Sequence, residues 1–185
     1  MRRDSLEPGG GVRPALVIRR ASPEDAEGIL ECLAAAFEPF RRSYTPLGFA
    51  DTVLAPEMLA RRLSEMSVFV AAAAGHVVGT VGCAPVAAGE GHIRGMAVRP
   101  GWQGRGVARR LLLAAEKELR QKGCLRVTLD TTAPLARAIR FYESNGYCAT
   151  GRMGDFFGMP LFEYARALKK SRAGTRESGV GKPRA

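Results

Sequence analysis

The residues of this chain with the clearest chemical use are the two glycines in the segment Gln103-Gly104-Arg105-Gly106-Val107-Ala108. A strand-like run, 92–98, precedes the segment, and a helix-like run, 108–121, follows it. Glycines at the start of a helix let backbone N–H groups approach a ligand without obstruction from a Cβ atom. The N–H groups of a first helical turn have no partner inside the helix, and the helix dipole makes that end partly positive. The segment therefore predicts a site for a phosphate-bearing cofactor.

Two common phosphate motifs do not fit this segment. A dinucleotide fingerprint needs a third glycine, where this chain has Arg109. A P-loop needs a lysine followed by serine or threonine, where this chain has Val107 and Ala108. A glycine-rich turn without any ligand stays open as the alternative at this point.

The pattern that does fit is Gln/Arg-x-x-Gly-x-Gly/Ala, which resembles the pyrophosphate-binding loop of the GCN5-related N-acetyltransferase (GNAT) family. A second segment, Ala138 to Tyr147, is similar to the family signature Ala-x-x-Phe-Tyr-Glu-x-x-Gly-Phe. The resemblance implies acetyl-CoA as cosubstrate. The backbone of Met96, Ala97 and Val98 would hold its pantetheine arm, and the amides of Gln103, Gly104, Arg105, Gly106, Val107 and Ala108 would hold its pyrophosphate. In the family a bulge splays the strand that holds the pantetheine arm, which here is the strand-like run 92–98. Gly95 is compatible with such an irregularity.

Tyr142 is the candidate general acid, because the family's tyrosine at this point of the signature lies near the CoA sulfur. A phenol with a pKa of about 10 keeps its proton at neutral pH. The alternative is a structural role, since Leu135, Ala138, Ile139 and Tyr142 share one helical face and a tyrosine there can belong to the core.

The general base is less defined by the sequence. Where family members often carry a glutamate on the strand before the loop, this chain has His92, whose ordinary pKa near 6.5 suits a base. Glu90 is a second candidate, because Glu90, His92 and Arg94 point to one face of a regular strand. An exposed polar strand end and a water relay both stay open as alternatives.

The acceptor side is expected in the loop 40–49, with Tyr44, and in the hairpin 155–158, where Asp155 is suited to attract a cationic amine. One family contact to CoA is missing, since the usual asparagine is replaced by Leu135, and Thr131 or Thr132 is a candidate substitute. Arg99 and Arg105 are candidates for additional positive charge beside the loop.

The elements that must position these residues follow from hydrophobic periodicity and turn signals. Strands are expected at 15–20, 67–73, 76–84, 92–98, 126–130, 147–153 and 160–167. A first helix is expected to start at Ser22, and further helices are expected at 56–65, 108–121 and 135–144. Loops or turns are expected at 44–48 and 85–91. This order predicts an α+β fold, a mixed and mostly antiparallel twisted sheet with helices on both faces, and it resembles the GNAT fold over most of the chain.

Composition limits the remaining choices. The 185 residues suffice for one domain, and we expect a flexible arm at 1–14, the acetyltransferase domain at 15–168 and a disordered basic tail at 169–185. That tail carries six basic residues and one acidic residue, which is half of the net charge of +10. A nucleic-acid partner is not favoured, although a basic tail can touch phosphates.

With no apolar run of membrane-spanning length and no secretory signal, we expect a cytoplasmic protein without a membrane partner. The four scattered cysteines predict buried, reduced thiols and no metal site.

The sequence thus predicts an acetyl-CoA-dependent N-acetyltransferase in which a primary amine, of a small molecule or a peptide, attacks the thioester directly in a ternary complex. The enzymatic alternative is transfer from another acyl-CoA. Two binding proteins remain as rivals, a CoA-binding sensor on the same fold and a basic nucleic-acid-binding module. Dimers are common among the proteins that this chain resembles, so a homodimer is one expected assembly.

Overall fold

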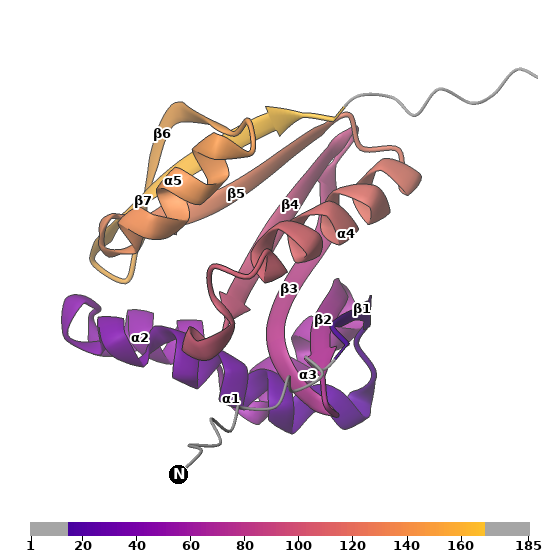
Figure 1. Cartoon of the computed structure of the whole chain (residues 1–185). Helices are drawn as coiled ribbons and strands as arrows, with labels where there is room; N and C mark the ends of the chain where they lie inside the picture. Colours follow the sequence, from indigo (N-terminus) through magenta and orange to yellow (C-terminus); the bar gives the residue numbers. More distant parts are fainter. Residues whose placement is uncertain (1–14, 169–185) are drawn as a thin grey trace, which may run out of the picture.

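The computed structural model describes residues 15–168; the predicted arm at 1–14 and the predicted tail at 169–185 lie outside the described residues. One seven-stranded sheet runs through this part of the chain, in the order β1-β2-β3-β4-β5-β7-β6 (Figure 1). All neighbours pair antiparallel except β4 and β5, which are parallel. The strands are β1 (Val17–Arg20), β2 (Ser67–Ala73), β3 (His76–Ala87), β4 (Glu90–Val98), β5 (Arg126–Thr132), β6 (Cys148–Phe156) and β7 (Met159–Ala167).

Between residues 15 and 168, five α-helices flank the sheet in two groups. They are α1 (Ala26–Phe37), α2 (Pro46–Val53), α3 (Pro56–Glu65), α4 (Val107–Gln121) and α5 (Ala136–Ser144). One core cluster joins α1 and α3 to β2 and β3 through residues such as Leu33, Leu59 and Val70. A second cluster joins α4 and α5 to the sheet through residues such as Leu111, Leu129 and Tyr142. The sheet therefore has helices on both faces, and the predicted α+β fold class is confirmed.

Two of the predicted loops are wrong. Segment 44–48 enters helix α2, because Pro46 suits a first helical position and the Thr45 hydroxyl accepts a hydrogen bond from the Gly48 N–H at 3.2 Å. Segment 85–91 is mostly strand, since β3 continues to Ala87 and β4 begins at Glu90. Pro85 is tolerated because the pairing of β3 and β4 is irregular between Pro85 and Ala87.

An irregularity in β4 shapes the centre of the molecule. The register against β3 changes from Gly82 opposite Arg94 to Thr80 opposite Ala97, so β4 carries one extra residue there. Gly95 lies within this bulge at a φ of 64°, in the left-handed region that glycine occupies without strain. The parallel pairing of β4 with β5 extends from Glu90 opposite Arg126 only to Ile93 opposite Leu129. Beyond that point the two strands diverge, as Figure 1 shows, and the expected bulge and splay are confirmed.

Candidate active site

A groove of about 500 Å³ lies beside the diverging end of β4 and the start of α4. Its walls include eight of the nine residues predicted to bind the cofactor: Met96, Ala97, Val98, Gln103, Gly104, Gly106, Val107 and Ala108. The ninth, Arg105, does not line the groove, because its guanidinium lies over the Trp102 ring at 5.3 Å from the centroid. Leu135 and Phe141 form part of the opposite wall.

The loop before α4 has the backbone that an anion site requires. Gly104 and Gly106 have φ values of 75° and 77°, both left-handed. Gly106 is the N-cap of α4, and the first helical hydrogen bond runs from the Arg110 N–H to the Gly106 carbonyl at 3.1 Å. The amides before Arg110 therefore have no partner inside the helix, and those from Gly104 onward are available to a ligand. The Gln103 N–H is engaged, because it donates to the Pro100 carbonyl at 3.2 Å. The Gln103 side chain fixes the loop by donating to the Val98 carbonyl at 3.0 Å.

Positive charge reaches the groove from other arginines than those proposed from the sequence. Arg99 donates to Glu31 at 2.7 Å and to the Val77 carbonyl at 2.9 Å, so its charge is engaged elsewhere. Arg109 and Arg137 line the groove instead, and Arg137 donates to the Gln103 side chain at 3.0 Å. A sequence without structure could not rank these arginines, because their roles depend on which way each side chain points.

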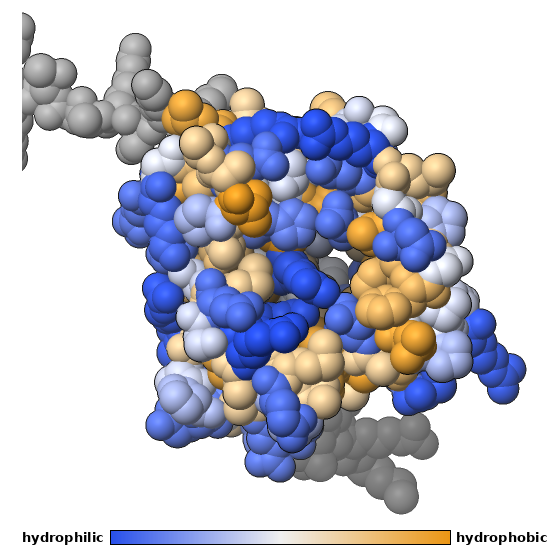
Figure 2. All heavy atoms as spheres, turned by 180° about the vertical axis from the view of Figure 1, so that it is seen from behind, coloured by the Kyte–Doolittle hydropathy of each residue, from blue (hydrophilic) through white to orange (hydrophobic). Residues whose placement is uncertain are grey.

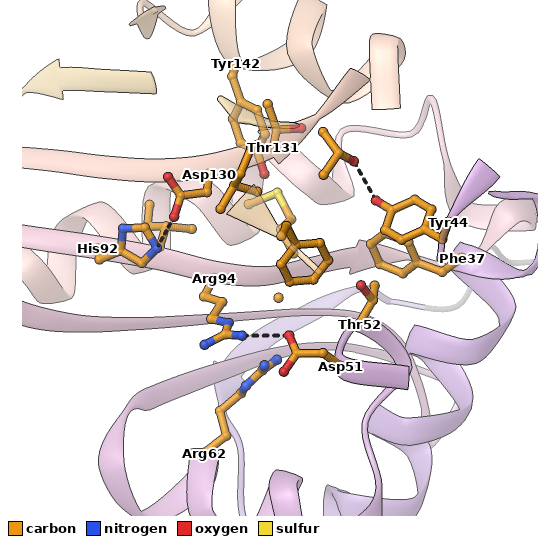
Figure 3. Close-up of a pocket in the computed structure, with 16 residues that line it drawn as sticks. Phe37, Tyr44, Asp51, Thr52, Arg62, His92, Arg94, Asp130, Thr131 and Tyr142 are labelled. Atoms are coloured by element: carbon orange, nitrogen blue, oxygen red, sulfur yellow. Dashed lines mark hydrogen bonds and ion pairs between the residues drawn. The ribbon is translucent and has the colours of Figure 1, made fainter. Parts of the chain in front are cut away.

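A second cavity of about 300 Å³ adjoins the groove, with walls from α1, α2, α3, α5, β4 and β5 (Figure 3). Three residues line both spaces: Phe37, Met96 and Tyr142. We call this second cavity the acceptor pocket. Its aromatic wall includes the predicted Tyr44, whose hydroxyl is hydrogen-bonded to that of Thr132 at 2.8 Å.

Tyr142 extends from α5 into the region between the two cavities (Figure 3). Tyr142 is 7% exposed and packs against the Phe141 and Tyr147 rings, so it also belongs to the hydrophobic core. Within residues 15–168 no hydrogen bond engages its hydroxyl, which is left available to a ligand. Burial raises the pKa of Tyr142, so the hydroxyl stays protonated at neutral pH.

His92 also lines the acceptor pocket and forms a pair with Asp130. Its Nε2 atom lies 3.6 Å from the Asp130 carboxylate, and its Nδ1 atom is 3.0 Å from the Thr128 hydroxyl. Burial lowers the pKa of His92, against the opposing effect of Asp130, so the imidazole is neutral at pH 7. Burial also raises the pKa of Asp130 above its ordinary value.

Glu90, the other predicted base, does not line the acceptor pocket. Its carboxylate forms an ion pair with Arg126 of the neighbouring strand. This ion pair directs the Glu90 carboxylate toward Arg126 of β5. The structure thus brings His92 and Tyr142 to one cavity and leaves Glu90 outside it.

Several polar residues of the pocket were not predicted from the sequence. Asp51 of α2 accepts from Arg94 at 2.8 Å, and Arg62 of α3 lies beside them (Figure 3). Thr131 is 3% exposed and its hydroxyl has no hydrogen-bond partner among the described residues. Thr131 and Thr132, the suggested substitutes for the contact missing at Leu135, line the acceptor pocket and not the groove. Asp155 does not line the pocket, because its carboxylate accepts from the Gly158 N–H at 3.1 Å within the β6–β7 turn.

The side of the molecule opposite to the view of Figure 1 is hollowed near its centre (Figure 2). Hydrophilic side chains surround the hollow, and hydrophobic ones gather on the side where α2 and the β6–β7 turn lie. Leu47 of α2 and Phe157 of that turn are 68% and 46% exposed.

Three cysteines, Cys32, Cys83 and Cys124, are buried, and Cys148 is exposed. Burial raises the pKa of Cys32 to about 11 and that of Cys83 to about 12, which makes both thiols poor nucleophiles. Within residues 15–168 no group of three or more potential ligands is arranged to hold a metal ion. No helix in the same range is both long and apolar enough to cross a membrane.

Comparison with known proteins decides the family. The sequence profile of the acetyltransferase (GNAT) family matches residues 29–147, which is more than half of the chain. The chain belongs to the GNAT acetyltransferase family. The matched region includes β4, the loop before α4 and the helix that carries Tyr142.

Individual relatives agree with this assignment. The chain is 32% identical over 163 residues to aminoglycoside N(6')-acetyltransferase type 1 of Stenotrophomonas maltophilia, covering 81% of this GNAT chain and 97% of that protein. It is 40% identical over 76 residues to the uncharacterized N-acetyltransferase YjgM of Escherichia coli K12, covering 40% of this chain and only 46% of YjgM. The chain thus matches less than half of the length of YjgM.

Solved structures share the fold. The PaiA N-acetyltransferase of Thermoplasma acidophilum, in complex with coenzyme A, superposes with a TM-score of 0.69 at 19% identity. That match covers 80% of this GNAT chain and 98% of the other.

Proposed function

We propose that this GNAT protein is an acetyl-CoA-dependent N-acetyltransferase that transfers the acetyl group to a primary amine by direct attack in a ternary complex. One observation carries the proposal: the groove beside the phosphate loop and the acceptor pocket share walls at Phe37, Met96 and Tyr142. Two ligands that occupy the two spaces would therefore meet beside the Tyr142 hydroxyl. The solved complex of PaiA with coenzyme A supports the same cosubstrate here.

The residues of the groove fit the cosubstrate. The free amides of the loop and of the first turn of α4 would bind its pyrophosphate, with Arg109 and Arg137 adding positive charge. The bulge at Gly95 directs backbone groups of Met96 away from the ladder toward the groove, where they can meet the pantetheine arm and the thioester.

The chemistry then needs two proton movements. As the amine nitrogen forms its bond to the acetyl carbon, its excess proton passes to the neutral His92 imidazole, directly or through water. As the carbon–sulfur bond breaks, the Tyr142 hydroxyl donates to the departing sulfur. Asp130 stabilises the imidazolium that results, because its carboxylate lies 3.6 Å from Nε2. Burial raises the pKa of the thiols of Cys32, Cys83 and Cys124, and direct attack by the amine needs no cysteine acyl-enzyme.

Release of CoA tests the proposal. Acetyl-CoA should raise the melting temperature of the full chain, and amines should then release CoA and yield an acetylated product identified by its mass. A thermal shift without CoA release from any of a broad panel of amines would favour the CoA-binding sensor. Comparison of acetyl-CoA with longer acyl-CoA esters distinguishes the alternative donor.

The pH profile tests His92 separately. For the wild type, kcat/KM should fall on the acidic side with a midpoint below the ordinary histidine value of about 6.5, because burial lowers the pKa of His92. A general base acts in its neutral form. The rate therefore falls as the pH drops through the pKa of His92 and the imidazole becomes protonated. The variant His92→Ala should lower the rate about 100-fold at neutral pH and flatten this acidic limb.

Glu90→Gln is the matched control, since Glu90 lies on the same strand but outside the acceptor pocket. Its acidic limb should stay where it is in the wild type. If the acidic limb of the kcat/KM profile stayed unchanged in His92→Ala, His92 would not be the base. The proton acceptor would then be a water relay or the substrate itself.

A further inference from the structure

The acceptor pocket contains a guanidinium whose charge no carboxylate of the described residues fully compensates. Arg62 of α3 lines the pocket and is directed toward Asp51 and Arg94 (Figure 3). Arg94 is already paired with Asp51 at 2.8 Å, and no carboxylate within residues 15–168 lies within 4.0 Å of the Arg62 guanidinium. Arg62 is half-buried, and this burial together with the neighbouring Arg94 lowers its pKa to about 10. The three charges sum to one uncompensated positive charge inside the pocket.

The backbone makes room for this guanidinium at the bulge of β4. A Cβ atom at Gly95 would lie 2.5 Å from Nη1 of Arg62, too close for both to be present without movement. Gly95 thus serves two purposes, the left-handed backbone and the space for Arg62. Gly95 also lets the Arg62 guanidinium lie close to the strand beside Met96, which lines both the pocket and the groove.

The other end of the pocket has the opposite character. The His92–Asp130 pair lies there, so this end of the pocket presents a carboxylate where the other end presents a guanidinium. Thr131, with its unpartnered hydroxyl, is the next residue of β5. The pocket is therefore dipolar, with a negative end on β4 and β5 and a positive end on α3.

We propose that the acceptor is a small α-amino acid, whose carboxylate binds Arg62 and whose amine faces His92 and Asp130. The inference rests on the proposed N-acetyltransferase function and names its substrate class. A carboxylate supplies the counter-charge that Arg62 lacks, and a guanidinium binds it through two parallel hydrogen bonds. The pocket has a volume of only about 300 Å³, so the carboxylate and the amine that it accepts must lie close together on one small molecule.

The same charges argue against a polycationic acceptor. The relative from Stenotrophomonas maltophilia is named for aminoglycosides, but Arg62 and Arg94 would repel an additional ammonium group in this pocket. An α-amino acid brings one charge of each sign to the two complementary ends.

Matched acceptors test the proposal. CoA release from acetyl-CoA is measured for a panel of α-amino acids, for the carboxamide of each, and for aminoglycosides. We expect kcat/KM for the preferred amino acid to exceed that for its carboxamide by about 10- to 100-fold, the usual effect of a charge-assisted hydrogen bond. Equal use of acid and carboxamide, or a preference for aminoglycosides, would overturn the proposal while leaving the N-acetyltransferase function intact. CoA release from no amine at all would instead contradict the proposed function.

The variant Arg62→Gln assigns the preference to its residue. It should raise KM for the amino acid by about 10- to 100-fold, leave KM for acetyl-CoA unchanged and bring acid and carboxamide close together. Arg61→Gln is the matched control, because Arg61 lies next to Arg62 on the same helix, is 70% exposed and faces Glu65 at 3.9 Å. A preference that survives Arg62→Gln in the folded protein would overturn the assignment. If that variant does not fold, the wild-type comparison of acid with carboxamide still decides whether the pocket selects a carboxylate.

Discussion

Replacing Tyr142 with phenylalanine should lower kcat about 100-fold while the affinity for acetyl-CoA stays close to that of the wild type. The hydroxyl lies where the groove and the acceptor pocket meet, and it has no partner within the described part of the chain. Its loss therefore leaves no buried group unsatisfied, and the ring can keep its packing against Phe141 and Tyr147. The effect should appear in turnover, measured by CoA release at saturating substrates, and not in the melting temperature.

Tyr147→Phe provides the matched control for this variant. Tyr147 is 1% exposed, its ring is 5.8 Å from that of Tyr142, and its hydroxyl donates to Glu116 at 3.1 Å. Removing this hydroxyl leaves a buried carboxylate with one donor fewer, so the melting temperature should fall while kcat is retained. If Tyr142→Phe turned over as fast as the wild type, Tyr142 would have a structural role only.

The second large effect is expected at the phosphate loop, where Gly106→Ala should weaken acetyl-CoA binding about tenfold or more. Gly106 has a φ of 77° and caps α4, so its backbone conformation is costly for alanine by about 1 kcal/mol. The added Cβ meets no atom of residues 15–168 within 4 Å, and because Gly106 lines the groove we expect the methyl group to crowd a bound ligand. Calorimetric titration of acetyl-CoA measures this loss directly.

Gly123→Ala separates backbone strain from ligand contact. Gly123 follows the far end of α4 with a φ of 82°, and a Cβ atom added there would likewise meet no atom of the described residues within 4 Å. Both variants should lose similar stability, because the same backbone strain acts in each. Only Gly106→Ala should lose affinity for acetyl-CoA; an equal loss in both would mean that the loop acts through folding and not through the ligand.

Local signals explain what the sequence could predict. The bounds of α3 follow from Pro56 and the helical periodicity, and the phosphate loop is a contiguous pattern of glycines before a helix. Tyr142 could be proposed as the general acid because the whole signature that contains it lies within one short segment, Ala138 to Tyr147. Such features depend on neighbours in the chain, so a sequence contains them in full.

The acceptor pocket depends on contacts between distant segments, which explains why much of it was missed. Asp130 becomes the partner of His92 because β4 and β5 pair in parallel with His92 opposite Thr128. With that register, the residue two places further along β5 could have been identified. Asp51 and Arg62 lie on helices α2 and α3, and part of α2 was predicted as a loop, so nothing linked them to Arg94. Glu90 was proposed as a base from strand alternation, which gives the face of a residue but not its ion pair with Arg126.

The most direct test of the central claim is CoA release from acetyl-CoA by the full chain in the presence of candidate amines. We expect amine-dependent release that saturates in both substrates and gives an N-acetylated product in equal amount. Saturating binding of acetyl-CoA with no amine-dependent release across the panel, α-amino acids included, would show that this protein is not an N-acetyltransferase for these amines.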